Sequence, residues 1–209
     1  MITHSTRRTR VVLPALLLGW ATAVTSGFAI LLRYKTTPGE ATQPLQRWPS
    51  HSRLTPSSDL ATLVLFAHPH CPCTHASVSE LARLMSRVSG RVVAYVVVVR
   101  PPGVPEDWDD TELRRRAAAI PGIRVIRDGE GLEAARFGAA VSGLTLLYDE
   151  KGQLRFAGGI TASRGHEGES FGGRRILAVL AGETPDRQDA PVFGCALGAS
   201  ANVGVEEGS

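Results

Sequence analysis

Two cysteines and three histidines lie within eight residues of one another, at His68, His70, Cys71, Cys73 and His75. Thiols exchange disulfides, and thiolates together with imidazoles bind soft metals such as Cu(I) or borderline ones such as Zn(II). A single proline separates the two cysteines, which is an unusual spacing for a structural zinc site. The cluster therefore predicts either thiol redox chemistry or a copper or zinc site.

The surrounding residues place this cluster where a strand passes into a helix. The apolar run over 60–67 is typical of a buried strand, and apolar residues at helical spacing predict a helix over 74–88 with Thr74 as its N-cap. Backbone N–H groups and the helix dipole stabilise an anion at such a position. We therefore expect Cys71 and Cys73 to cycle between dithiol and disulfide, with His70 or His75 tuning the thiolate.

The rest of the chain alternates strands with helices before it ends in a hairpin. Further strands are predicted over 92–99, 123–126, 145–148 and 154–158, and helices over 109–120, 131–139 and 172–181. Parallel strands joined by helical crossovers and followed by an antiparallel hairpin give an α/β sandwich with a mixed central sheet.

This topology brings a second polar loop to the cysteine edge of the sheet. The second strand of the hairpin is expected to run parallel to strand 60–67, so the loop after it ends near the cysteines. That loop carries Arg164, His166 and Glu167 between glycines. Two interpretations stay open: a contact with substrate or a proton-transfer group, or an exposed polar loop.

A third cysteine, Cys195, lies far from the other two in an apolar island over 191–195. Val192 and Phe193 have no place in a fully solvated tail, so we expect the island to dock at the cysteine edge. Cys195 would then be a resolving thiol or a third soft metal ligand; the alternative is a small residue with no role. Three cysteines leave one over after any single disulfide.

The N-terminal region predicts a membrane span. Residues 11–32 carry no charge and are about 33 Å long as a helix, enough to cross a hydrocarbon core of roughly 30 Å. Three arginines precede the span, which favours a cytoplasmic N-terminus. A cleaved signal peptide is the alternative, because residues 21–23 have the small-x-small form of a cleavage site.

The charge distribution excludes a nucleic-acid reader. The net charge is +3, but five of the 23 basic residues precede the first acidic residue, Glu40, so the remainder carries 18 basic against 20 acidic residues. We expect five parts in the chain. They are a cytoplasmic tail over 1–10, a transmembrane anchor over 11–32, a flexible linker over 33–58, a folded domain over 59–182, and a C-terminal tail with the Cys195 island over 183–209.

Residues 58–182 resemble the thioredoxin superfamily, in which a Cys-x-x-Cys motif occupies this strand-to-helix junction. The stretches HPHCPCTHAS, SGLTLLYDEKG, GGITASRGHEG and PVFGC are similar to membrane-anchored bacterial TlpA-like and RedB-like proteins. The resemblance implies a thioredoxin-like three-layer sandwich preceded by one transmembrane helix. In a gapless register Cys73 matches the family's second cysteine and His70 its first, while Leu144 stands where the family has a cis-proline.

Three functions follow from these observations. The first is a membrane-anchored, extracytoplasmic thiol-disulfide redox protein of the bacterial inner membrane, with its domain in the periplasm and with protein thiols or a membrane reductant as partners. The second is a copper or zinc binding or delivery module that uses the histidine and cysteine cluster. The third is a thioredoxin-like assembly factor without turnover.

Overall fold

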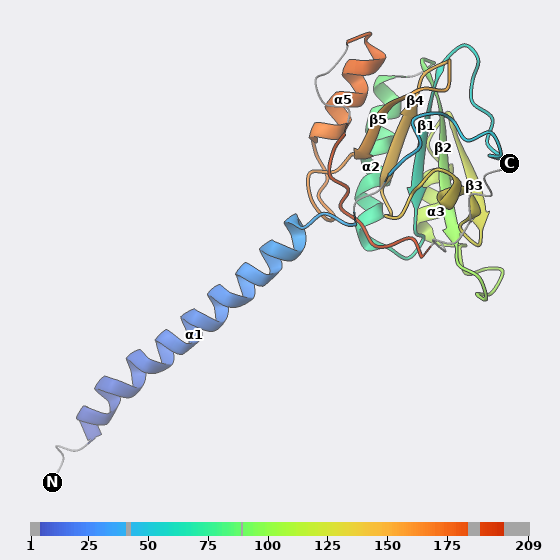
Figure 1. Cartoon of the computed structure of the whole chain (residues 1–209). Helices are drawn as coiled ribbons and strands as arrows, with labels where there is room; N and C mark the ends of the chain where they lie inside the picture. Colours follow the sequence, from blue (N-terminus) through green and yellow to red (C-terminus); the bar gives the residue numbers. More distant parts are fainter. Residues whose placement is uncertain (1–4, 41–42, 89, 184–188, 199–209) are drawn as a thin grey trace, which may run out of the picture. The chain divides into compact units, whose positions relative to one another are not determined.

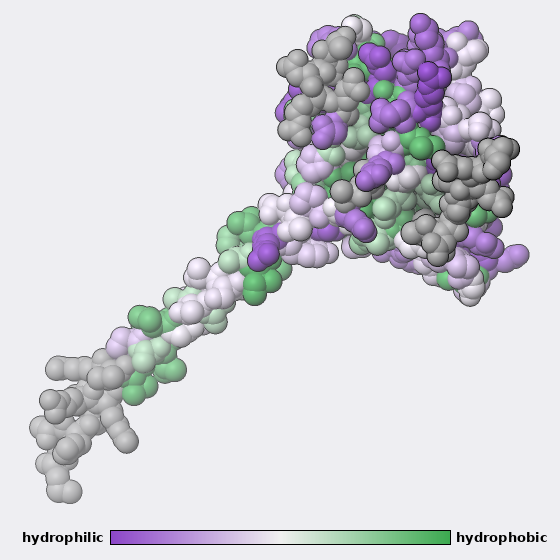
Figure 2. All heavy atoms as spheres, viewed as in Figure 1, coloured by the Kyte–Doolittle hydropathy of each residue, from purple (hydrophilic) through white to green (hydrophobic). Residues whose placement is uncertain are grey.

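The computed structural model describes residues 5–40, 43–88, 90–183 and 189–198, and the chain divides into two units after Thr37. The first unit is one helix, α1 (Ser5–Thr36). Its segment Val12–Thr36 has a hydropathy of 1.9 and none of it is buried. Figure 2 shows the apolar side chains along this helix. By length and composition α1 is able to span a membrane. An N-terminal signal sequence would have the same length and composition.

The second unit is built on one mixed five-stranded sheet (Figure 1). The strands lie in the order β3-β2-β1-β4-β5. Strands β1, β2 and β3 are parallel, and β4 and β5 form an antiparallel hairpin on the other side of β1. The strands are β1 (Ala61–Ala67), β2 (Val92–Arg100), β3 (Ile123–Gly129), β4 (Leu144–Tyr148) and β5 (Leu154–Gly159). The predicted topology is confirmed.

Two hydrophobic cores lie on the two faces of this sheet, because β1, β2 and β4 are buried on both sides. One core contains Leu81, Leu113 and Ile176, and is covered by three helices. The other contains Phe66 and Phe137 and is covered by one short helix and by segments without regular structure. The helices are α2 (Pro72–Arg87), α3 (Glu112–Ala118), α5 (Phe171–Leu180) and the short α4 (Leu132–Arg136).

Several boundaries differ from those predicted, because polar residues take part in regular structure. Strand β3 continues to Gly129, since its pairing with β2 extends to Arg100, although Arg127 and Asp128 resemble loop residues in the sequence. The carboxylate of Asp128 is buried and accepts backbone hydrogen bonds from the first turn of α4. Helix α3 begins later than predicted because Thr111 caps it through Arg114 N.

The segment before the sheet differs from the flexible linker expected over 33–58. From Pro38 on, the chain belongs to the compact second unit. Trp48 packs edge-on against Phe137 and Tyr148, with ring centroids 5.0 and 5.2 Å apart, and Leu54 is buried in the second core. We call the described residues 43–58 the N-terminal arm. Its apolar side chains cover a sheet face that α4 alone is too short to cover.

The N-terminal arm is expected to contribute measurably to stability. Trp48→Ala should lower the free energy of unfolding by about 2–3 kcal/mol, less than the roughly 3–5 kcal/mol for a fully buried aromatic side chain, because Trp48 is only partly buried. The matched control is Leu45→Ala on the same arm, which removes a side chain that is 48% exposed. This control should change the free energy of unfolding by less than about 0.5 kcal/mol. Urea unfolding followed by circular dichroism measures both. Equal, small effects would mean that the arm is a tether.

Candidate active site

The site forms where β1 ends and α2 begins. Cys71 is the N-cap residue of α2 in an extended conformation, and Pro72 occupies the first helical position. Proline is favoured there because its fixed φ suits a helix and its missing N–H has no helical acceptor. The prediction of Thr74 as the N-cap was therefore wrong, because the helix begins about one turn earlier. Cys71 and Cys73 are both buried, with 1% and 7% of their surface exposed.

The third cysteine meets the first. Cys195 Sγ lies 2.8 Å from Cys71 Sγ, although the two residues are 124 positions apart in the sequence. Cys195 is only partly buried, whereas Cys71 has almost no exposed surface. All three cysteines are free thiols in this structure. The island around Cys195 therefore docks where the sequence analysis expected it.

Residues 189–198, which we call the C-terminal arm, are fixed to the sheet by backbone and side-chain contacts. Ser142 N donates to Cys195 O at 2.8 Å, and Leu197 N donates to Ala140 O at 2.9 Å. Leu197 is fully buried. A Cβ at Gly194 would lie 1.8 Å from Ser142 O, so only glycine allows this close approach. These contacts hold Cys195 against Cys71.

The environments of the three thiols push their pKa values apart. Burial raises the pKa of Cys71, but hydrogen bonds from Cys195 and Thr74 outweigh it and leave that pKa lowered. Burial and the charge of Cys71 raise the pKa of Cys73 against the opposing effect of Arg164. Burial, and the hydrogen bond that it gives to Cys71, raise the pKa of Cys195 to about 12. Cys71 is thus the thiol of the three that ionises most readily, and its two neighbours hold their protons more tightly.

A chain of hydroxyl groups supports this thiolate. His68 N donates to Ser142 Oγ at 2.8 Å, and Ser142 Oγ lies 2.6 Å from Thr74 Oγ1. If Thr74 donates to Cys71, Ser142 must donate to Thr74, so each group polarises the next. Sequence reasoning missed Ser142, which is buried and comes from the loop before β4. Its only sequence signal is the neighbouring Gly143, whose φ of 91° marks a special turn.

Two of the histidines beside the cysteines contact Trp108. His70 Nε2 is 2.8 Å from Trp108 O, and the ring of His68 packs edge-on against Trp108. Burial and the nearby His70 lower the pKa of His68, which favours the neutral ring. His75 lies half-buried in the first turn of α2. Among the described residues no group of three His, Cys, Asp or Glu side chains could hold a metal ion.

The polar side chains of the loop after β5 make contacts in two different regions. Arg164 Nη1 donates to Gly194 O at 2.6 Å, which puts its charge beside Cys73 and Cys195. Glu167 instead pairs with Arg83 on α2 at 3.1 Å, and His166 is exposed. Arg164 therefore belongs to the thiol site, whereas Glu167 ties the loop to α2.

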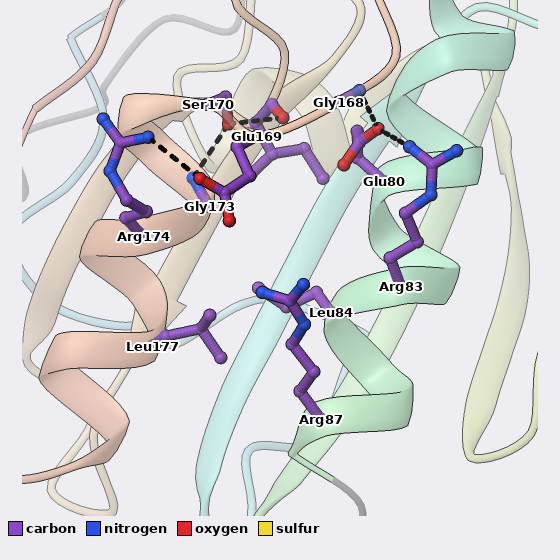
Figure 3. A pocket seen from close by; sticks show the side chains of 11 residues that line it. Glu80, Arg83, Leu84, Arg87, Gly168, Glu169, Ser170, Gly173, Arg174 and Leu177 are labelled. Atoms are coloured by element: carbon purple, nitrogen blue, oxygen red, sulfur yellow. Dashed lines mark hydrogen bonds and ion pairs between the residues drawn. The ribbon is translucent and has the colours of Figure 1, made fainter.

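A separate cavity of about 250 Å³ lies between α2 and α5 (Figure 3). Its floor is apolar, with Leu84 and Leu177, and its rim carries arginines and glutamates. Glu80 accepts from Gly168 N at 2.5 Å and pairs with Arg83. None of the three cysteines lines this cavity, so it is distinct from the thiol site.

Leu144 does not reproduce the family's cis-proline. It lies at the start of β4, fully buried, and the described residues include no cis peptide bond. Instead, Gly143 N donates to Phe66 O at 2.8 Å. The edge beside Cys71 is occupied by the C-terminal arm, whose Cys195 O binds Ser142 N in the same turn.

Comparison with known proteins finds structural relatives but no sequence match. No protein-family model matches the sequence, and no curated protein matches it. A hypothetical protein of Sinorhizobium meliloti is similar in structure, with a TM-score of 0.58, 21% identity, and coverage of 80% of this chain and 100% of that one. An uncharacterized conserved protein from Geobacillus kaustophilus has a TM-score of 0.55 and 20% identity over 78% of this chain and 92% of its own.

A more distant match is a secreted disulfide oxidoreductase of Mycobacterium tuberculosis, with a TM-score of 0.43 and 12% identity over 60% of this chain and 83% of that one. In the present chain the cysteine-bearing turn follows the central strand of a mixed sheet that ends in an antiparallel hairpin. That strand order, three parallel strands followed by an antiparallel hairpin with helices on both faces, is the thioredoxin-like arrangement that the sequence predicted, so the predicted fold class is confirmed.

Proposed function

We propose that this protein is a thiol-disulfide redox protein in which Cys71 is the reactive thiol. The observation that carries the proposal is a thiolate-favouring cysteine at the N-terminus of α2 with two protonated thiols as neighbours. Cys195 lies 2.8 Å from Cys71 between the two sulfur atoms, and Cys73 is near enough for the charge of Cys71 to raise its pKa. A redox protein needs one thiolate to attack a disulfide and a second thiol to resolve the product.

The proposal includes a location on the outer side of the bacterial inner membrane. Helix α1 would anchor the chain, and the three arginines that precede its apolar segment would stay in the cytoplasm, so the second unit would lie in the periplasm. Disulfides form and persist in that compartment. Partners would be protein thiols or a membrane reductant.

The reactive thiolate can be tested by titration. Absorbance of the full-length protein at 240 nm, in detergent micelles, should rise by one thiolate below the usual thiol pKa of about 8.5. Cys71→Ser should remove this transition. Thr74→Val should move it upward by about 1 pH unit because the thiolate loses a hydrogen-bond donor, while Thr74→Ser keeps the hydroxyl.

The lowered pKa of Cys71 makes the stability of the fold depend on pH in a defined direction. The folded pKa of Cys71 lies below its unfolded value, so the stabilisation is present above the unfolded pKa and is lost as pH falls through the folded pKa. A titration in which no thiol ionises early, or in which Cys71→Ser changes nothing, would contradict the assignment of Cys71.

Activity gives an independent test. Full-length protein should reduce a disulfide-linked fluorogenic peptide in the presence of reduced glutathione, and Cys71→Ser should lower the rate to that of glutathione alone. The control Ser86→Ala, exposed farther along α2, should keep the full rate. A Cys71→Ser protein as active as the wild type would rule out the proposed role.

The anchor is tested by extraction. The full-length chain should stay in the membrane pellet after an alkaline carbonate wash, because an uncleaved apolar helix leaves a bilayer with great difficulty. A chain that begins at Pro38 should be released. A mature full-length product that begins near Val24 would show instead that α1 is a signal sequence.

A further inference from the structure

We propose that the disulfide of this protein joins Cys71 to Cys195 rather than to Cys73, and that Cys195 is the sulfur at which a partner thiol enters. The inference rests on the thiol-redox function proposed above and names the second thiol of that function. It assigns a chemical role to the C-terminal arm, a segment outside the predicted domain of residues 59–182.

The position of Cys195 favours this pairing. A disulfide has an S–S distance of about 2.05 Å, so the two sulfur atoms, now 2.8 Å apart, need to approach by less than 1 Å. Hydrogen bonds on both sides of Cys195 hold the arm in place: Arg164 binds Gly194 O, and Ala196 pairs with Val141. The backbone of the C-terminal arm therefore fixes the position of Cys195 Sγ beside Cys71.

Cys73 is less well placed for the same bond. The side chain of Cys73 also hydrogen-bonds to Cys71, but a disulfide between them would have to close across Pro72, whose fixed φ restricts the backbone that would have to bend. A Cys-x-Cys bridge also closes a small, strained ring. Cys73 remains close enough for the charge of Cys71 to raise its pKa, which keeps it a protonated neighbour.

Exposure and leaving-group chemistry both direct an incoming thiol to Cys195. Cys71 is 1% exposed and lies beneath the arm, whereas Cys195 is partly open to solvent. A thiol of lower pKa is the better leaving group in disulfide exchange. Attack at Cys195 releases Cys71, which α2 and Thr74 stabilise as a thiolate, whereas attack at Cys71 would release Cys195, whose pKa is raised by burial.

In the complete exchange, a protein dithiol reduces the Cys71–Cys195 disulfide and is itself oxidised to a disulfide. One partner thiolate attacks Cys195 Sγ, the Cys71–Cys195 bond breaks, and its electron pair stays on Cys71. The second partner thiolate then attacks the partner sulfur of the mixed disulfide. Cys195 leaves and takes a proton, and the partner becomes a disulfide. Two electrons have passed to Cys71 and Cys195, and a second disulfide, such as oxidised glutathione, regenerates the bond as it becomes two thiols.

Peptide mapping of the oxidised full-length protein tests the pairing. After equilibration with oxidised glutathione in detergent and alkylation of remaining thiols, trypsin leaves Cys71 and Cys73 together in residues 54–83 and Cys195 in residues 188–209. We expect these two peptides to be linked in the wild type and in Cys73→Ser. The link should be lost in Cys71→Ser and in Cys195→Ser.

Other mapping results would overturn the inference. An internal disulfide within residues 54–83, with Cys195 alkylated, would assign the pair to Cys71 and Cys73 and leave the proposed function intact. A link that survives Cys71→Ser and disappears in Cys73→Ser would assign it to Cys73 and Cys195. Failure of any disulfide to form at all glutathione ratios would remove the redox function together with the inference.

The entry point is tested on oxidised Cys73→Ser protein exposed briefly to limiting reduced glutathione and then quenched with acid. The mass increase of one glutathione should appear mainly on residues 188–209, with Cys71 recovered as a free thiol. A glutathione adduct mainly on residues 54–83 would show that the partner attacks Cys71.

Discussion

The hydrogen bond between two sulfur atoms, Cys71 and Cys195, is the interaction on which the site depends. A thiolate in a buried place loses the solvation that stabilises its charge, and burial alone would raise its pKa. In this protein the donors come from three segments distant in sequence. The first turn of α2 supplies Thr74, the C-terminal arm supplies Cys195, and the loop before β4 supplies Ser142, which supports Thr74. Removing the arm would leave Cys71 with one donor fewer and with more water.

The fold makes docking of the arm necessary for reasons that have nothing to do with sulfur. One face of the sheet is covered by α2, α3 and α5, but among the described helices only α4 lies on the other face. Leu54 from the N-terminal arm and Val192 and Leu197 from the C-terminal arm complete that second core. Burial of each such side chain contributes about 1.5–3 kcal/mol, so the core itself fixes the register that sets Cys195 opposite Cys71.

The sequence predicted the parts of this structure that follow from local pattern. The apolar runs predicted every strand, the alternation of strands and helices predicted the topology, and Val192 and Phe193 predicted that the island around Cys195 docks. It did not predict the N-terminal arm, because Trp48 stands alone in a polar stretch and its aromatic partners are distant in sequence. Ser142 was missed for the same reason, since a single hydroxyl carries no periodic signal.

The arrangement also explains why the histidines, the most conspicuous residues of the sequence cluster, are not what lowers the pKa of Cys71. His70 binds a backbone carbonyl, burial biases His68 towards its neutral form, and neither histidine is among the groups that lower the pKa of Cys71. The groups that lower that pKa are neutral hydrogen-bond donors from Cys195 and Thr74. A thiolate paired with an imidazolium loses its counterion when the histidine deprotonates near pH 6.5, and exposed charges are weakened by salt. Neutral donors and a helix terminus in a buried place are little affected by either change. The thiolate of Cys71 therefore depends on the arm remaining docked rather than on the protonation of its histidine neighbours.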